Sequence, residues 1–235
     1  MTGRQDEPGG RSALVVGASR GLGLALVEEL ARRGCHVVAT QRSNAPPLAA
    51  LTTRHPQFVE IETVDINEVD SVRALRRRLE GRSFHLILIN AGIALATNAT
   101  PANVDERDFH AMMLTNALAP VRALEILEDL VRHDGVIAVM SSELGSVTNN
   151  NGYWNLYSAS KAALNMLMKG FAGRRPSDPR SMLLLAPGWI KTDMGGSEAP
   201  LTVDETIPLV VDTIDASIGV PGLRFIDRFG KIICW

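Results

Sequence analysis

The chain has 235 residues, of which 46% are hydrophobic and 21% charged, and its formal net charge at pH 7 is −2. This length suits one large α/β domain or two small ones, and the composition is that of a globular protein with a sizeable core. A charge so close to zero gives no reason to expect nucleic acid or an anionic membrane as the main partner. Because no apolar run reaches about 18 residues, we also expect no membrane span.

The two cysteines, Cys35 and Cys234, lie far apart and lack metal-ligand spacing. They predict a reduced, cytoplasmic protein rather than a disulfide scaffold, with both thiols packed as small buried hydrophobic groups. The five histidines form no metal pattern, so the sequence predicts no metal site. The polar start has no apolar stretch typical of a signal peptide, and we expect a flexible N-terminus over residues 1–10.

Short apolar runs alternate with helical patterns along the rest of the chain. In chain order, the pattern predicts a strand at 12–18, a helix at 23–34, strands at 36–40 and 58–65, a helix at 68–81, a strand at 84–92, a long helix at 105–135, a strand at 135–142, a helix at 157–173, a strand at 181–188, a helix at 202–214 and a last strand at 222–227.

Strands this apolar are covered on both faces, as in a parallel sheet with helices on each side. The alternation begins at the first strand and continues without a linker or a repeat. It predicts a single doubly wound, Rossmann-type α/β domain over residues 11–235, with a sheet of about seven strands. Ligands of such sheets bind beyond the carboxyl ends of the strands, so the chemistry is expected there.

A glycine-rich turn, GASRGLG, joins the first strand to its helix. Gly17 permits the tight turn, Gly21 lets the backbone approach a pyrophosphate, and Gly23 lets helix and strand pack closely. The N-terminus of the helix would then direct unpaired N–H groups at the phosphates. Glycine spacing alone is weak evidence, but at the end of a first apolar strand it predicts nucleotide binding.

The second strand indicates which nucleotide is bound. An NAD site usually has an acidic residue at the end of this strand, whereas the sequence here is ATQRSN, with Arg42 and no acid. Arg20, inside the glycine turn, is expected to point to the same region. Two guanidinium groups suit a 2′-phosphate, so we expect NADP(H) rather than NAD(H); the alternative is that both are ordinary surface arginines.

The only two tyrosines, Tyr153 and Tyr157, lie in the stretch GYWNLYSASK. Tyr157 and Lys161 are four residues apart and therefore share a helical face. A phenol has a pKa near 10; a neighbouring ammonium, together with the positive nicotinamide ring of the oxidised cofactor, would lower it and favour the phenolate. Tyr157 is thus a candidate for proton transfer. Tyr153 has no lysine four residues on and is expected to line the cleft or simply to pack.

From Gly17 to about Thr192 the chain resembles the short-chain dehydrogenases/reductases. The segments GASRGLG, VDI, NAG, SS, YSASK and PGWIKT occur in the family's order and spacing. With the two arginines, the resemblance implies cofactor contacts at Gly17, Ser19, Arg20, Gly21, Leu22, Gly23, Arg42, Asp65, Ile66, Asn90, Ala91, Gly92, Tyr157, Lys161, Pro187, Gly188, Ile190 and Thr192.

The same resemblance implies the reacting residues. Tyr157 would be the general acid and base, Lys161 would tune it and bind the ribose, and Ser142 would polarise the substrate oxygen. Ser141 is the alternative to Ser142, which alignment through Gly145 favours.

Asn116 matches the family's helix asparagine that completes a proton relay. Pro120 has no N–H group, so the Asn116 carbonyl lacks its usual partner four residues on and could hold a water molecule on the way to Lys161. A polar residue at a helix kink is the alternative interpretation of Asn116.

The substrate region is less specified. An apolar pocket is expected from Leu144, Tyr153, Trp154, Trp189 and Met194, under a mobile lid at residues 193–201. The loop between Ser142 and Tyr157 is about two residues longer than in many members of the family, with TNNNG as the insertion.

The sequence therefore predicts an NADPH-dependent enzyme that reduces a ketone, aldehyde or quinone, or oxidises an alcohol. The segments SSELGS and PGWIKTDMGG and the closing CW resemble the carbonyl-reductase branch related to sniffer and the bacterial C-factor proteins. The rival interpretations are a non-catalytic NADP-sensing protein and a methyltransferase, which the serine, tyrosine and lysine order argues against. The resemblance to this family, whose members often assemble through their helices, implies a homodimer or homotetramer.

Overall fold

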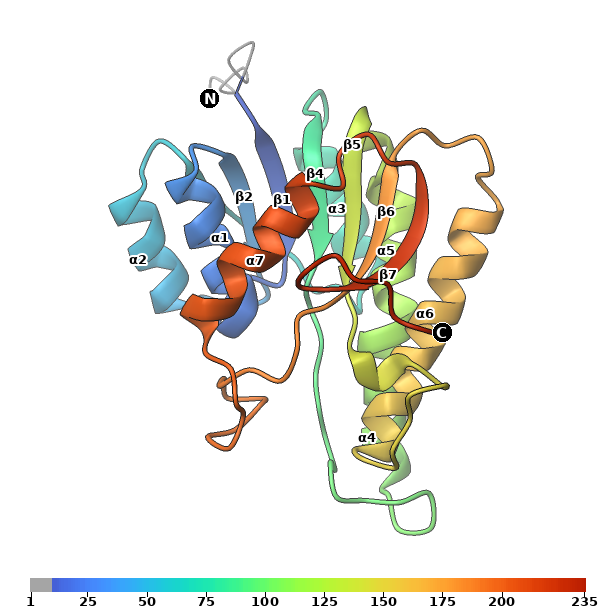
Figure 1. The fold of residues 1–235 in the computed structure, drawn as a ribbon. Helices are drawn as coiled ribbons and strands as arrows, with labels where there is room; N and C mark the ends of the chain where they lie inside the picture. The colour runs from blue at the N-terminus through green and yellow to red at the C-terminus, as the bar shows by residue number, and fades with distance from the viewer. Residues whose placement is uncertain (1–9) are drawn as a thin grey trace.

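The computed structural model describes residues 10–235, and it is built on one seven-stranded, all-parallel sheet (Figure 1). The strand order is β3-β2-β1-β4-β5-β6-β7. The strands are Ser12–Val16 (β1), His36–Gln41 (β2), Val59–Thr63 (β3), Phe84–Ile89 (β4), Val131–Met140 (β5), Ser181–Ala186 (β6) and Gly222–Asp227 (β7). The predicted doubly wound α/β fold is confirmed. The predicted flexible N-terminus falls, except for Gly10, outside the described residues.

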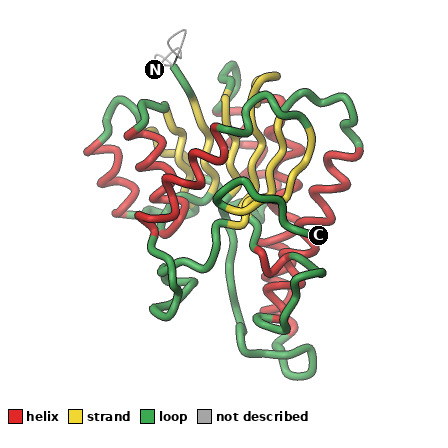
Figure 2. Tube along the Cα trace, in the orientation of Figure 1, coloured by secondary structure: helices red, strands yellow, loops and turns green. Residues whose placement is uncertain are grey.

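Helices cover both faces of the sheet, as Figure 2 shows. They are Gly21–Arg32 (α1), Pro46–Arg54 (α2), Val69–Arg78 (α3), Glu106–Met113 (α4), Ala119–Leu127 (α5), Asn155–Gly173 (α6) and Val203–Asp215 (α7). Alternate side chains of a strand point to opposite faces. Leu14 and Val16 of β1 accordingly pack in the core that α3, α5 and α6 cover, while Ala13 and Val15 pack in the core beneath α1, α2 and α7. These two cores fix the carboxyl ends of the strands at one edge.

The long helix predicted at 105–135 is wrong in its continuity and in its end. The structure has α4, then a π-helical turn at Leu114–Leu118, α5, and a 3₁₀ turn at Glu128–Leu130. Pro120 explains the interruption, because it supplies no N–H group to the helical ladder.

Strand β5 begins at Val131, four residues before its predicted start at Gly135. Phe84 pairs with Val131 and Leu86 with Val136, so two positions along β4 span five along β5. This bulge leaves Arg132, His133 and Asp134 exposed, and their polarity concealed the strand from the sequence pattern.

Helix α2 was not predicted. It has nine residues, begins with two prolines and buries only Leu48 and Leu51. Proline at the first helical position is compatible with a helix, since the N–H group there has no partner within the helix. Two buried positions are too few to produce a helical period in the sequence.

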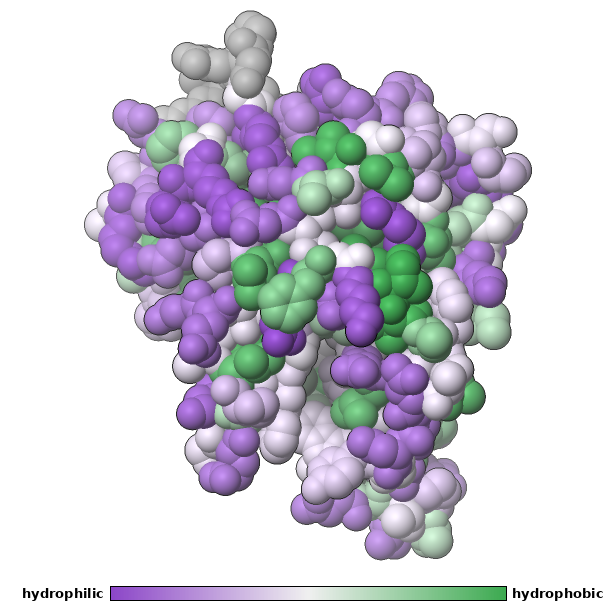
Figure 3. Space-filling view, viewed as in Figure 1, coloured by the Kyte–Doolittle hydropathy of each residue, from purple (hydrophilic) through white to green (hydrophobic). Residues whose placement is uncertain are grey.

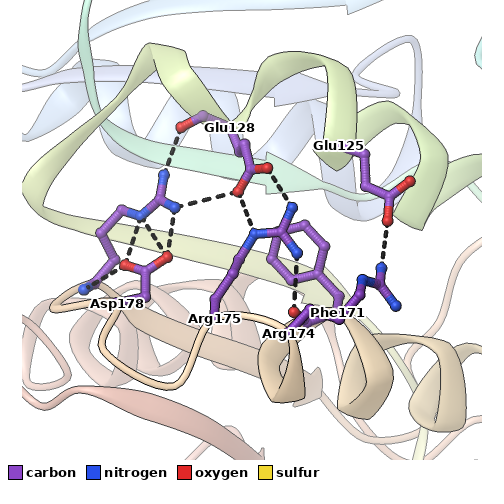
Figure 4. A network of polar contacts seen from close by, with 7 residues as sticks. Glu125, Glu128, Phe171, Arg174, Arg175 and Asp178 are labelled. Atoms are coloured by element: carbon purple, nitrogen blue, oxygen red, sulfur yellow. Dashed lines mark hydrogen bonds and ion pairs between the residues drawn. The ribbon is translucent and has the colours of Figure 1, made fainter.

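The amino ends of β5 and β6 are fastened by a network of ion pairs (Figure 4). Glu128 pairs with Arg175 and Arg180, and Arg180 also pairs with Asp178. Because these residues precede their strands, the network lies at the edge of the sheet opposite the carboxyl ends. It belongs to the scaffold rather than to the site described below.

The two cysteines differ in environment. Cys35 is buried, and burial raises the pKa of its thiol to about 12. Cys234 is exposed, so the prediction that it packs as a buried hydrophobic group is wrong. Within residues 10–235 no helix is long and apolar enough to cross a membrane, and no group of three or more His, Cys, Asp or Glu side chains could hold a metal ion.

Candidate active site

The glycine turn is braced by the segment that follows β4. Asn90 donates from Nδ2 to the carbonyl oxygen of Gly17 at 2.8 Å, and the N–H group of Ala91 donates to that of Val16 at 3.0 Å. Gly17 has φ +92°, and a Cβ there would lie 2.7 Å from the Ala91 nitrogen. At Gly23 a Cβ would lie 2.1 Å from the Gly17 oxygen. The turn therefore tolerates no side chain at these two positions.

The turn leaves the N-terminus of α1 open toward the carboxyl edge. Arg20 is the N-cap residue, its side chain makes no capping bond, and the first turn of α1 contains no acidic residue. The first N–H groups of a helix have no partner within it and carry the positive end of the dipole. The compact turn, the free N–H groups and the lack of acid together fit a dinucleotide phosphate.

The two arginines expected at a 2′-phosphate lie in different surroundings. Arg20 forms an exposed ion pair with Asp193, with 3.3 Å between Nη1 and Oδ2. Arg42 is exposed just after β2 and makes no hydrogen bond or ion pair with any residue in 10–235. The ion pair with Asp193 directs Arg20 to the segment after β6. The joint role of the two guanidinium groups at a 2′-phosphate stays a prediction.

At the expected adenine end, Asp65 follows β3 and its carboxylate accepts the N–H group of Asn67 at 3.0 Å. Ile66 is buried in the core. Ser19 and Leu22, in and after the glycine turn, are half-buried. All four residues lie at the carboxyl edge, where the sequence predicted them.

At the expected nicotinamide end, the segment after β6 folds back on itself. Ile190 is buried and bridges to Leu201, and Trp189 donates from Nε1 to the Gly195 oxygen at 2.7 Å. A Cβ on Gly21 would lie 3.9 Å from the Thr192 Cγ2 atom, so this segment borders the glycine turn. Pro187 and Gly188, which link the segment to β6, occupy the same edge. The expected mobility of residues 193–201 stays a prediction.

Tyr157, Ser142 and Lys161 come together at this edge. Ser142 follows β5, and its hydroxyl lies near Tyr157 on α6, close enough to counteract part of the rise in the pKa of that tyrosine. One turn along α6, Lys161 places Nζ 5.7 Å from the centre of the Tyr157 ring and donates to the Met140 carbonyl oxygen at 2.9 Å. The Tyr157 and Lys161 side chains are buried.

Burial shifts the pKa values of both groups. It raises the pKa of Tyr157 to about 12, and the nearby Ser142 hydroxyl opposes that rise. Burial also lowers the pKa of Lys161 to about 8. The Lys161 ammonium donates to the Met140 carbonyl oxygen, and desolvation is the largest influence on the Tyr157 pKa. The lowering of that pKa by the lysine together with the oxidised nicotinamide ring stays a prediction.

Asn116 joins three elements through its side chain. The Ile93 N–H group donates to Oδ1 at 2.8 Å, while Nδ2 donates to the Ile93 oxygen at 2.8 Å and to Ser160 Oγ at 3.0 Å. Ser160 in turn donates to the Tyr157 carbonyl oxygen at 2.7 Å. A Cβ on Gly92 would lie 3.3 Å from Asn116 Oδ1 and 3.6 Å from Lys161 Nζ, which places the NAG segment against the same group. The proposed water on the Asn116 carbonyl stays a prediction.

The two adjacent serines have separate roles in the structure. Ser141 is buried and donates from Oγ to Asn165 Oδ1 at 2.7 Å, whereas Ser142 is half-buried and reaches Tyr157. Ser142 is therefore the better candidate to meet a substrate.

An apolar wall surrounds Tyr157, and two of the five predicted pocket residues belong to it. Leu144 and Trp154 pack there, and the Trp154 ring meets the Tyr157 ring edge-on at 5.5 Å. Tyr153 is 66% exposed, and Trp189 and Met194 are exposed on the segment after β6. The wall also contains Met112, Ile93, Ala94, Leu95, Ala99, Val104, Phe109 and Leu156, which sequence reasoning missed.

Figure 3 shows the surface hollowed between the loops at the lower end of the molecule, toward which the strands run.

Two polar residues near this site were not predicted, Ser160 and Asn165. The spacing of Asn165, four residues after Lys161, was the available signal.

The comparisons with known proteins agree with this site. A family model described as short chain dehydrogenase matches residues 11–200. A short-chain dehydrogenase/reductase from Burkholderia multivorans, solved with bound NADP, is 44% identical over 96% of this chain and 99% of its own, with a TM-score of 0.94. A carbonyl reductase from Pseudomonas aeruginosa PAO1 in complex with NADP is 36% identical over 96% and 100% of the two chains, with a TM-score of 0.89.

The carbonyl reductase Sniffer of D. melanogaster is 29% identical over 96% of this chain and 100% of its own, with a TM-score of 0.85. Its presence among the similar structures agrees with the resemblance of the sequence to the carbonyl-reductase branch. Because the family model spans most of the chain and the motifs meet at one edge of the sheet, this oxidoreductase belongs to the short-chain dehydrogenase family.

Proposed function

We propose that the protein is an NADP-dependent oxidoreductase that reduces a ketone, aldehyde or quinone, or oxidises the corresponding alcohol, with Tyr157 as the general acid and base. The observation that carries the proposal is the meeting of Tyr157 with the buried Lys161, 5.7 Å from its ring, and with Ser142 at the carboxyl edge of the sheet. The fit of the glycine turn to a dinucleotide and the NADP in two similar structures support the cofactor.

In reduction, bound NADPH supplies the hydride that forms the new C–H bond at the carbonyl carbon. The carbonyl oxygen takes its proton from the Tyr157 hydroxyl, which a pKa of about 12 keeps protonated at neutral pH. Ser142 donates a hydrogen bond to the same oxygen and stabilises the charge that develops on it. In oxidation, Tyr157 acts in its phenolate form and accepts the proton from the alcohol.

Lys161 and Asn116 support this transfer. The Lys161 ammonium supplies positive charge one turn from Tyr157 and would hold the ribose, while Asn116 fixes the loop after β4 to α6. The apolar wall around Tyr157 favours a small apolar carbonyl compound as the substrate class. By family habit we propose a homodimer or homotetramer in the cytoplasm.

The test is NADPH oxidation against a panel of ketones, aldehydes and quinones, followed for the wild type and for Tyr157→Phe. Turnover by the wild type that the variant loses is the expected result. Tight NADPH binding with no turnover of any compound would favour the non-catalytic NADP-sensing alternative. Turnover that the variant retains would refute the role of Tyr157.

A further inference from the structure

Helix α6 carries a third buried polar residue in step with its two reacting residues. Tyr157, Lys161 and Asn165 succeed one another at intervals of four and lie on one face of the helix. Asn165 is 3% exposed. A buried carboxamide is costly unless both its donor and its acceptor are used, so its partners indicate what it does.

Both ends of the Asn165 carboxamide hold the loop after β5. Oδ1 accepts the hydroxyl of Ser141 at 2.7 Å, and Nδ2 donates to the carbonyl oxygen of Gly145 at 3.1 Å. Ser142 lies between these two anchors. The Ser141 N–H group also donates to the Leu185 oxygen of β6 at 2.7 Å, which ties the first anchor to the sheet.

The loop is compact and rests directly on α6. The Gly145 N–H group donates to the Ser142 carbonyl oxygen at 2.9 Å, and the Leu144 N–H group donates to Ser142 Oγ at 3.2 Å. A Cβ on Gly145 would lie 3.0 Å from both Asn165 Nδ2 and Lys161 Cβ. The contact of loop and helix therefore has no space for an alternative packing.

We propose that Asn165 is a positioning residue that holds the Ser141–Gly145 turn on α6, and thereby keeps Ser142 beside Tyr157. This inference rests on the proposed function, because its effect on rate passes through Ser142. Reacting groups on two different elements need such support, since a displacement of about 1 Å can cost about 100-fold in rate.

The residue type is specific to this task. Aspartate could still accept from Ser141 but has no N–H group for the Gly145 oxygen. Leucine has about the right size but leaves both partners without a bond. Asn165→Asp and Asn165→Leu therefore remove one anchor and two anchors, respectively, at similar volume.

The experiment is a double-mutant cycle between Asn165 and Ser142. We expect Asn165→Leu to lower kcat by about 10- to 100-fold with the affinity for NADPH, measured by fluorescence titration, unchanged. In a Ser142→Ala background the same change should lower kcat by less than about twofold, because the group it positions is gone. If the double variant loses kcat by the full product of the two single-variant losses, the proposal is overturned.

A control separates positioning from general stability. Ser217→Ala removes another buried hydroxyl, which donates to the Thr213 oxygen at 2.8 Å and lies near the amino end of β6. It should lower the melting temperature without changing kcat. If Asn165→Leu does not fold, Asn165→Asp is expected to show the smaller, still non-additive loss.

A crystal structure of the Asn165 variant provides a readout besides activity. We expect Ser142 Oγ to lie farther from the Tyr157 hydroxyl than in the wild type; an unmoved Ser142 would contradict the proposal. The outcomes also distinguish the two levels of inference. If Tyr157→Phe turns over as fast as the wild type, the proposed function with Tyr157 as acid and base is refuted. If the losses in kcat from the Asn165 and Ser142 variants combine independently, only the role of Asn165 is refuted.

Discussion

Lys161 donates a hydrogen bond from Nζ to the backbone carbonyl oxygen of Met140 at 2.9 Å, and its side chain is buried. Burial disfavours the ammonium and lowers the pKa of this lysine to about 8. The structure thus keeps a costly charge beside Tyr157, and activity and stability should respond to it in opposite directions.

Replacement of this charge should stabilise the fold and abolish turnover. We expect Lys161→Met to raise the free energy of unfolding at pH 7 by about 1–3 kcal/mol, because it removes a buried ammonium. Thermal or urea denaturation measures the change, with the exposed Lys169→Met on the same helix as the control. A variant that is both active and no more stable than the wild type would contradict the assignment.

The stability advantage should depend on pH. The folded-state pKa of Lys161, about 8, lies below its ordinary value of 10.5, so the folded protein releases this proton first. Wild-type stability therefore gains from this group as pH rises from about 8 toward 10.5, and the advantage of Lys161→Met shrinks over that window. If the extra stability of Lys161→Met instead grows as the pH rises, the pKa of Lys161 is not lowered in the folded protein.

The rate of carbonyl reduction should fall once as the pH rises. Tyr157, with a pKa of about 12, stays protonated across the accessible range, whereas Lys161 loses its charge near pH 8. We expect kcat/KM for reduction to decline above about pH 8 in a single step. A profile that stays flat to about pH 10 would contradict a requirement for the ammonium.

The glycine turn should tolerate no added methyl group. Gly23→Ala would place a Cβ 2.1 Å from the Gly17 oxygen and distort the turn, so NADPH binding should weaken by about 100-fold or be lost. Fluorescence titration of NADPH measures this. Gly173→Ala is the matched control, since a Cβ there meets nothing within 4 Å, and it should bind NADPH normally.

The preference for NADPH over NADH should depend on Arg42 and Arg20. Removal of either guanidinium should lower the affinity for NADPH by about tenfold and leave that for NADH nearly unchanged, because only NADPH carries the 2′-phosphate. Parallel titrations with both nucleotides measure the ratio. Equal losses for the two nucleotides would indicate a general effect on the turn instead.

The sequence predicted the sheet because its strands are apolar on both faces, and it predicted the glycine turn and Tyr157 with Lys161 because their spacing has a direct physical meaning. It missed the start of β5, because Arg132, His133 and Asp134 lie exposed in a bulge. Asn165 was missed because its spacing after Lys161 indicates a shared helical face but not which residues it bonds. The effect of burial on the Tyr157 pKa could not be predicted, because burial and the direction of the Lys161 side chain depend on tertiary packing.

The central claim is proton transfer by Tyr157, and the chain offers a matched pair of variants for it. With a carbonyl substrate and NADPH, Tyr157→Phe should lower kcat by about 100- to 10,000-fold at unchanged NADPH affinity. Tyr153→Phe, which removes the other, 66% exposed phenol, should retain nearly full activity. Comparable rates for Tyr157→Phe and the wild type would contradict the account.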